Sequence, residues 1–140
     1  ALDYVAGFCV CNDISERAFQ TERGGQWMKG KGSPTFGPIG PWLVTTDEVK
    51  DVQNLHMYLD LNGKRVQNGS TKTMIFGVAH IVAYISQFMQ LDAGDVITTG
   101  TPPGVGMGMK PQLYLKPGDK MVVGIEGLGE QHQTVEAYKG

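Results

Sequence analysis

One stretch near the N-terminal end of the chain carries the side chains that can do chemistry. An apolar run over residues 4–11 predicts a buried strand, and polar sequence replaces it abruptly at Asp13. Three more hydrogen-bonding side chains follow at short intervals, namely Ser15, Arg17 and Gln20. A carboxylate at a strand end, beside cationic and amide groups, is typical of a site that positions a charged ligand.

A glycine-rich loop then brings Lys29 and Lys31 before apolar sequence returns at residues 39–44. Each candidate also has a plain structural interpretation. Asp13 can cap the strand end in an Asx-turn, and Lys31 can be a solvated loop lysine. Arg17 can pair with Glu16 or Glu22 on a surface turn.

Length and composition indicate one soluble globular domain. The chain has 140 residues, of which 41% are apolar and 19% charged. Its 12 basic and 14 acidic residues leave a net charge of −2, without a basic run longer than two residues, so we expect no nucleic-acid partner. The apolar run at 74–85 contains Gly77 and His80 and falls short of the roughly 20 residues of a membrane span, so we expect no membrane partner either. Cys9 and Cys11 point the same way from one strand, which predicts reduced thiols in a cytoplasmic protein.

The rest of the sequence predicts an α+β fold that is rich in strands. Residues 55–61 alternate between apolar and polar, and Asn62-Gly63 predicts a hairpin whose partner strand covers residues 64–67. Apolar side chains recur every three or four residues over about 72–90, which predicts the main amphipathic helix, with Ser70, Thr71 or Thr73 as its cap. His56 and His80 fall on polar faces and are expected in solvent.

A ten-residue pattern around Gly-Asp occurs twice, at 91–100 and 115–124, and predicts a turn that leads into a strand each time. The glycine-rich segment between the two copies can approach a ligand closely. Two glycine-rich segments resemble nucleotide-binding motifs but lack residues that those motifs require. In the G-x-x-x-x-G-K of residues 25–31, Gly32 replaces the Ser or Thr and Pro34 blocks the helix start; the glycines at 104–108 lack the dinucleotide spacing.

Several motifs, in order along nearly the whole chain, resemble the fumarylacetoacetate hydrolase family. They are N-D-I-S-E-R-A-F-Q at 12–20, G-K at 30–31 with F-G-P-I-G-P-W at 36–42, T-G-T-P at 99–102 and I-E-G-L-G at 125–129. More narrowly, G-G-Q-W-x-K-G-K, Q-N-G-S-T and M-I-F-G-V-A-H resemble the 2,4-diketo-3-deoxy-sugar-acid hydrolase branch, whose members are often labelled ureidoglycolate lyase.

The resemblance implies a mixed β-roll with flanking helices, usually dimeric, that binds one Mg²⁺, Mn²⁺ or Ca²⁺ ion. By this mapping Asp13 is a metal ligand, Lys31 is catalytic, and Arg17, Gln20, Lys31 and Thr101 contact the substrate. The family's other two ligands lie on an E-x-E strand upstream, which this sequence lacks, as it lacks the family's histidine segment. We therefore expect residues 1–140 to be a single domain that is the C-terminal portion of a longer catalytic domain.

The functional hypothesis is metal-dependent hydrolysis of a C–C bond in a 2,4-diketo acid, giving pyruvate and a second carboxylic acid. Alternatives within the family are an acylpyruvate hydrolase, a ureidoglycolate lyase, an oxaloacetate-type decarboxylase or an isomerase. The alternative outside enzymes is a truncated, catalytically dead binding or dimerisation module, and the fragment alone is expected to be inactive.

Overall fold

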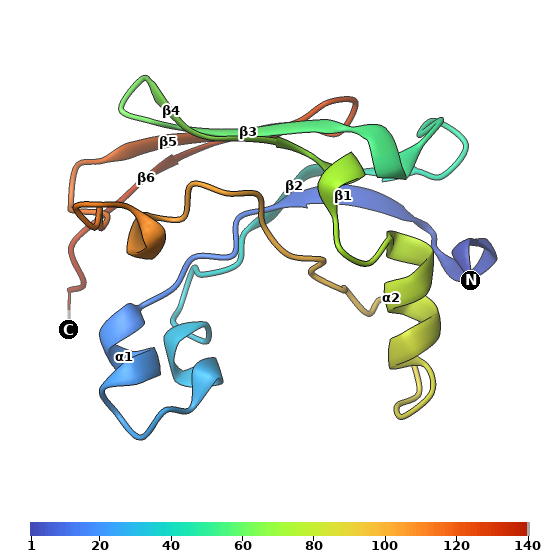
Figure 1. The fold of residues 1–140 in the computed structure, drawn as a ribbon, viewed down its shortest axis with the longest axis horizontal. Helices are drawn as coiled ribbons and strands as arrows, with labels where there is room; N and C mark the ends of the chain where they lie inside the picture. The colour runs from blue at the N-terminus through green and yellow to red at the C-terminus, as the bar shows by residue number, and fades with distance from the viewer. Residues whose placement is uncertain (140) are drawn as a thin grey trace.

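The structure of the protein is a computed structural model that describes residues 1–139. In this part of the chain, strands form two antiparallel sheets. The two-stranded sheet consists of β1 (Gly7–Cys11) and β2 (Ile39–Thr45). The four-stranded sheet has the order β4-β3-β5-β6 and consists of β3 (His56–Leu61), β4 (Lys64–Ser70), β5 (Lys120–Ile125) and β6 (Gly129–Thr134). The smaller sheet lies beneath the β5–β6 part of the larger one in the view of Figure 1.

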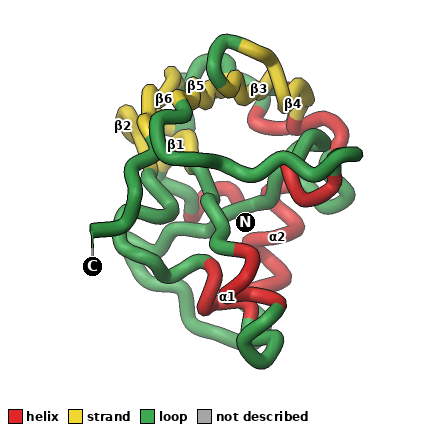
Figure 2. Tube along the Cα trace, turned by 90° about the vertical axis from the view of Figure 1, so that its left-hand side faces the viewer, coloured by secondary structure: helices red, strands yellow, loops and turns green. Residues whose placement is uncertain are grey.

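The two helices lie on the same side of the sheets (Figures 1 and 2). They are α1 (Arg17–Thr21), which follows β1, and α2 (Val78–Ile85), which follows the β3–β4 hairpin. Short 3-10 turns occupy Leu2–Tyr4, Trp27–Gly30, Val52–Asn54, Thr71–Thr73 and Gly106–Gly108. Among residues 1–139, none of the helices has the length and apolar content that crossing a membrane requires.

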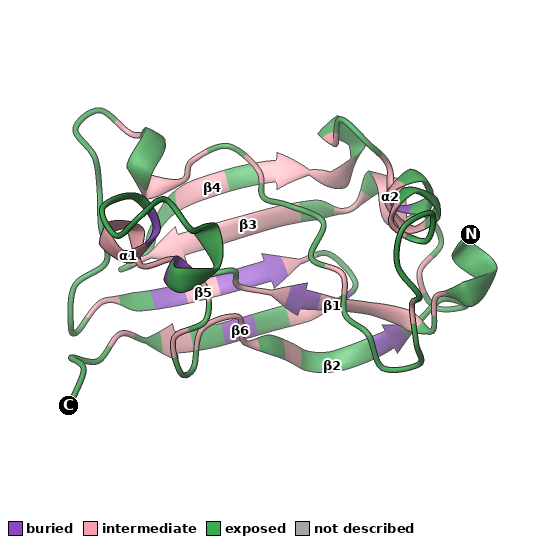
Figure 3. Ribbon diagram, turned by 90° about the horizontal axis from the view of Figure 1, so that it is seen from below, coloured by how far each residue is buried: buried purple, intermediate pink, exposed green. Residues whose placement is uncertain are grey.

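The core lies where the two sheets meet. Its buried residues come from β1, β2, β5 and the β5–β6 turn, and Figure 3 shows most of them as buried segments of neighbouring strands: Val10, Val44, Met121, Val123 and Leu128. Leu55, Leu59 and Leu61 of the alternating segment pack against this cluster, as their spacing predicts. The β-rich α+β fold expected from the sequence is confirmed.

The Asn62-Gly63 hairpin is also confirmed. Both residues have positive φ angles, 52° and 78°, the backbone that a two-residue hairpin turn requires. The Asn62 side chain accepts a hydrogen bond from the Lys120 amide at 2.9 Å, which ties the turn to β5. The returning strand β4 continues to Ser70 and is longer than the predicted 64–67.

The main helix is much shorter than the predicted 72–90, which was wrong at both ends. Ser70 caps the separate Thr71–Thr73 turn, and the chain is extended at Met74 before α2 starts. The late start has a cause far away in the sequence: the Gln53 side chain accepts a hydrogen bond from the Val78 amide at 2.6 Å and so caps the helix there. Val78 is buried, but Phe88 lies beyond the helix and is 61% exposed. His80 is exposed, as expected, and stacks between Phe76 and Tyr84.

The prediction of two Gly-Asp turns feeding two strands is correct for one copy. The second copy leads into β5, but the first leads into residues 96–99, which form no strand. Val96 is 57% exposed, and no described segment pairs with it. A strand needs a hydrogen-bonding neighbour as well as a suitable sequence, and within residues 1–139 this segment has none.

Candidate functional site

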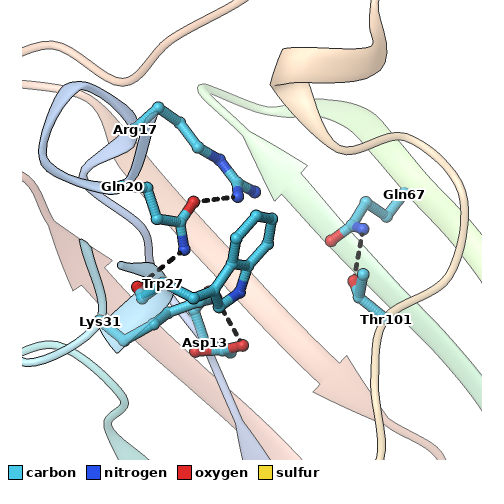
Figure 4. Close-up of polar contacts among 7 residues, drawn as sticks. All are labelled: Asp13, Arg17, Gln20, Trp27, Lys31, Gln67 and Thr101. Carbon is cyan, nitrogen blue, oxygen red and sulfur yellow. Dashed lines mark hydrogen bonds and ion pairs between the residues drawn. The ribbon is translucent and has the colours of Figure 1, made fainter. Parts of the chain in front are cut away.

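Asp13 and Lys31 form an ion pair just beyond the end of β1. The Lys31 ammonium nitrogen lies 2.6 Å from the Asp13 Oδ2 atom and 3.3 Å from the Asp13 backbone oxygen (Figure 4). The Lys31 side chain is 26% exposed and that of Asp13 52% exposed. The pair is therefore open to ligands on one side and partly shielded from solvent on the lysine side.

The loop places Lys31 by packing the backbone of Gly30 tightly against α1. The Gly30 carbonyl accepts a hydrogen bond from the Glu16 amide at 2.8 Å. A Cβ atom at position 30 would lie 2.5 Å from the Glu16 backbone oxygen and 2.7 Å from the Gln20 Cγ atom, so only glycine fits here. Lys29 points elsewhere, because its ammonium donates to the Arg23 backbone oxygen at 2.7 Å. The two lysines of this loop therefore make different contacts, Lys31 with Asp13 and Lys29 with Arg23.

Gln20 links α1 to the loop from inside. Its side chain is 1% exposed, accepts a hydrogen bond from Arg17 at 2.7 Å and donates one to the Trp27 backbone oxygen at 3.3 Å. The Arg17 guanidinium lies 6.0 Å from the centroid of the Trp27 ring, within cation–π range. Arg17 forms no ion pair with Glu16 or Glu22 among the described residues. Glu16 instead caps α1 by accepting from the Ala18 amide.

Thr101 lies apart from this group, beside β4 (Figure 4). Gln67 of β4 donates to the Thr101 hydroxyl and to the Pro102 carbonyl, each at 2.9 Å. Thr101 lines a shallow hollow of about 420 Å³. Gly104 and Gly106 of this segment pack against the protein's own backbone, since a Cβ at these positions would lie 2.0 Å from the Val66 and 1.8 Å from the Leu113 carbonyl oxygen. Gln67 was not predicted as a site residue, although it belongs to the Q-N-G-S-T motif.

The structure therefore brings four of the five candidates together in one connection, 13–31, and places the fifth on another segment. Their individual roles as ligand, catalyst or substrate contacts stay predictions. Cys11, two residues before Asp13, is a free thiol. Burial raises its pKa, and the neighbouring Asp13 carboxylate and Cys9 raise it further, so the thiol is neutral near neutral pH and a poor nucleophile.

A hard divalent cation needs several oxygen ligands. Asp13 suits one of these positions, because its carboxylate is exposed and follows the rigid end of a strand. Among residues 1–139, however, no group of three or more His, Cys, Asp or Glu side chains is placed to hold a metal ion. The described residues thus fit one ligand of a cation site and do not complete it.

Comparison with known proteins identifies the class. The family model described as "Fumarylacetoacetate (FAA) hydrolase C-terminal" matches residues 1–136. A protein of Burkholderia multivorans is 65% identical over 99% of this chain and 50% of its own length. Its name gives it provisionally as a hydrolase and states no substrate.

Three solved structures are similar throughout the chain. Fumarylacetoacetate hydrolase from Exiguobacterium antarcticum is 43% identical with a TM-score of 0.94, over 98% of this chain and 49% of its own. The 2-hydroxyhepta-2,4-diene-1,7-dioate isomerase from Mycobacterium marinum is 39% identical with a TM-score of 0.85, over 97% and 50%. Maleylpyruvate hydrolase from Sphingobium sp. SYK-6, in complex with manganese(II) and pyruvate, is 32% identical with a TM-score of 0.82, over 96% and 45%.

The chain belongs to the fumarylacetoacetate hydrolase family, which confirms the resemblance found in its motifs. It spans about half the length of the curated relatives it matches. The narrower assignment to the sugar-acid hydrolase or ureidoglycolate lyase branch is not confirmed by these relatives and stays a prediction.

Proposed function

We propose that the protein containing this chain is a divalent-metal-dependent hydrolase of 2,4-diketo (acylpyruvate-like) acids, which releases pyruvate and a second carboxylic acid. The observation that carries this proposal is the contact between the Lys31 ammonium and the Asp13 carboxylate, 2.6 Å apart at the end of β1. Membership of the family supports the reaction class. The manganese and pyruvate bound to the related maleylpyruvate hydrolase support the metal and the product.

The reaction accounts for the residue types. Water adds to the C4 carbonyl, the C3–C4 bond breaks, C4 leaves as a carboxylate and C3 leaves as the enolate of pyruvate, which then takes up a proton. Asp13 would hold one coordination position of a divalent cation, which would supply positive charge for the enolate oxygen. Lys31 is expected to donate a charge-assisted hydrogen bond to a substrate carboxylate or enolate oxygen.

Arg17 and Thr101 are proposed to complete the substrate contacts. The planar guanidinium of Arg17 suits a carboxylate group, and its position is held by the hydrogen bond to Gln20. Gln20 is proposed to support Arg17 and not to contact the substrate itself, because the Gln20 side-chain amide is buried and already hydrogen-bonded to the Trp27 backbone. Thr101 would reach the substrate from the opposite side, through the hydroxyl that Gln67 holds.

We also propose that the protein containing this chain is a homodimer.

Isomerisation is the second candidate, because a structural relative at 39% identity is a 2-hydroxyhepta-2,4-diene-1,7-dioate isomerase. Both reactions pass through an enolate beside a carboxylate, so the same cation and lysine can serve either one. They differ in whether water attacks a carbonyl, and therefore in whether the substrate is cut.

The decisive experiment uses the full-length protein with a panel of acylpyruvates and 2-hydroxydienoates. Pyruvate release is followed by a coupled lactate dehydrogenase assay, before and after chelation with EDTA and after addition of Mn²⁺ or Mg²⁺. Hydrolysis predicts pyruvate that disappears with chelation and returns with the metal. Isomerised products of unchanged mass, without pyruvate from any substrate, would contradict the hydrolase proposal and favour the isomerase.

A further inference from the structure

Two glutamines on β6 reach across to the other sheet. Gln131 and Gln133 are two residues apart and so share one face of the strand. Gln131 is 9% exposed, and its side-chain nitrogen donates to backbone oxygens of Val10, Gly40 and Pro38 at 2.9, 3.0 and 3.2 Å. A β6 side chain therefore holds the β1–β2 sheet at the end from which Asp13 emerges.

The hydrogen bonds continue from Gln131 toward the site. The Gln133 amide donates to the Gln131 side-chain oxygen at 2.5 Å, and the Asn12 amide donates to the Gln133 oxygen at 2.6 Å. Asn12, Gln133 and Gln131, called here the amide chain, thus all point the same way. Asn12 begins the chain as a donor, and Gln133 and Gln131 each accept from one neighbour and donate to the next, an arrangement in which each bond strengthens the others.

The amide chain fixes the backbone on the N-terminal side of Asp13. The Pro38 carbonyl accepts from the Asn12 backbone amide at 3.1 Å as well as from Gln131, so Asn12 is held at both its backbone and its side chain. The Asn12 carbonyl in turn accepts from the Ile14 amide at 2.9 Å. Asp13 sits between these two anchored residues.

Packing alone would favour apolar side chains at positions 131 and 133. The β5 residues directly opposite Gln131 and Gln133 are Val123 and Met121, both members of the apolar core. Polar amides in such a layer are costly unless every group is bonded, and within residues 1–139 no buried side-chain nitrogen or oxygen lacks a partner. The hydrogen bonds run to the backbone beside Asp13, which suggests that their task is to orient this residue.

We propose that Asn12, Gln133 and Gln131 are positioning residues that aim the Asp13 carboxylate at the cation. This inference rests on the proposed function, in which Asp13 is a metal ligand. The three residues are proposed to touch neither substrate nor metal and to act through the backbone of Asn12, directly before Asp13. Loss of a partner that orients a ligand typically weakens metal affinity by about 10- to 100-fold.

The test measures Mn²⁺ affinity of the full-length protein by electron paramagnetic resonance, which is independent of turnover. Gln133→Met keeps the length of the side chain and removes both hydrogen bonds, so we expect the Kd for Mn²⁺ to rise at least about tenfold. His132→Gln is the matched control, because His132 lies between the two glutamines on the opposite face of β6 and is exposed. Its Kd should stay within about twofold of the parent.

Asn12→Ala interrupts the amide chain at its half-exposed end, where folding is least at risk, and should weaken Mn²⁺ binding to a similar degree. The double variant Asn12→Ala with Gln133→Met should bind Mn²⁺ no more weakly than the weaker-binding single variant, because both substitutions interrupt the same chain of hydrogen bonds. The Tm is measured for each protein. A role confined to stability would lower the Tm and leave the Mn²⁺ spectrum and Kd of the folded fraction unchanged.

Asp13→Ala, measured in parallel, separates the two proposals. Loss of Mn²⁺ binding in Asp13→Ala, with a Kd within about twofold of the parent in Asn12→Ala, overturns the positioning role and leaves the proposed function standing. Unchanged Mn²⁺ binding in Asp13→Ala overturns the ligand role of Asp13. Should Gln133→Met fail to fold, Asn12→Ala alone decides the question.

Discussion

Replacing Lys31 by Met in the full-length protein tests whether this ammonium is a positioned donor. Methionine keeps most of the length and apolar volume of the side chain and removes its charge. The change deletes the contacts of 2.6 and 3.3 Å to the Asp13 carboxylate and backbone oxygen. The Gly30 packing that shapes the loop is left in place.

The expected loss follows from the position of the group. A preorganised donor to a developing oxyanion contributes on the order of 3 kcal/mol to transition-state stabilisation, and about 1.4 kcal/mol corresponds to a factor of ten. We therefore expect kcat/KM to fall roughly 100-fold. The ion pair itself is partly exposed, 26% for Lys31 and 52% for Asp13, so its loss should change the free energy of unfolding by less than about 1 kcal/mol. A large kinetic effect with a small stability effect is the diagnostic result.

Lys29→Met is the internal control, since Lys29 shares the loop but bonds to the Arg23 backbone oxygen. It should lower kcat/KM by no more than about threefold. Initial rates of pyruvate release give kcat/KM for both variants, and urea titration gives their stability. Similar, modest losses in both variants would refute the reasoning and reduce the loop to a source of general positive charge.

Three further predictions follow from individual contacts. Asp13→Ala should abolish the dependence of turnover on Mn²⁺ or Mg²⁺ while leaving the circular dichroism spectrum intact, because the residue is exposed beyond a strand end; metal-dependent turnover at the parent rate would contradict this. Gly30→Ala should cost about 1–3 kcal/mol in urea titration and also reduce kcat/KM, since the new Cβ would lie 2.5 Å from the Glu16 backbone oxygen; an unchanged midpoint would show that the loop yields freely. The Tyr58 hydroxyl lies 2.6 Å from the Glu130 carboxylate and holds the pKa of Glu130 below its usual range. The stabilisation of the folded state by this hydrogen bond is therefore present above the ordinary pKa of Glu130 and is lost as the pH falls through the lowered pKa. The difference in urea midpoint between the parent and Tyr58→Phe should therefore shrink from about pH 7 to about pH 3, and a difference that stays constant would argue against the carboxylate's part in it.

Most strands were predictable because their signals are local. The alternation over 55–61 gives β3, and the positive φ angles that Asn and Gly tolerate give the hairpin after it. The start of the helix was not predictable, because the group that caps α2 is the side chain of Gln53, 25 residues before Val78. β6 was also hard to foresee, since its sequence, G-E-Q-H-Q-T, has no apolar residue.

The candidate site divides in the same way. Asp13 and Lys31 were each identified as a candidate from motifs within one connection, and the structure shows in addition that they are in contact. Gly30 has no positive φ; glycine is required there by the close approach of α1, which depends on packing and is not visible in the local sequence. The amide chain was missed, because Asn12 and Gln133 are 121 positions apart and share no local pattern.

The connection between β1 and β2 is closed largely by bonds among its own residues. Glu16 bonds to Gly30, Gln20 to Trp27, and Lys31 to Asp13, so the middle of the segment closes on itself, while β6 holds its two ends at Asn12 and Pro38. The residues in the middle of this segment can therefore be substituted while the sheets beneath it keep their packing. Such substitutions are expected to alter the site with little effect on the packing of the two sheets.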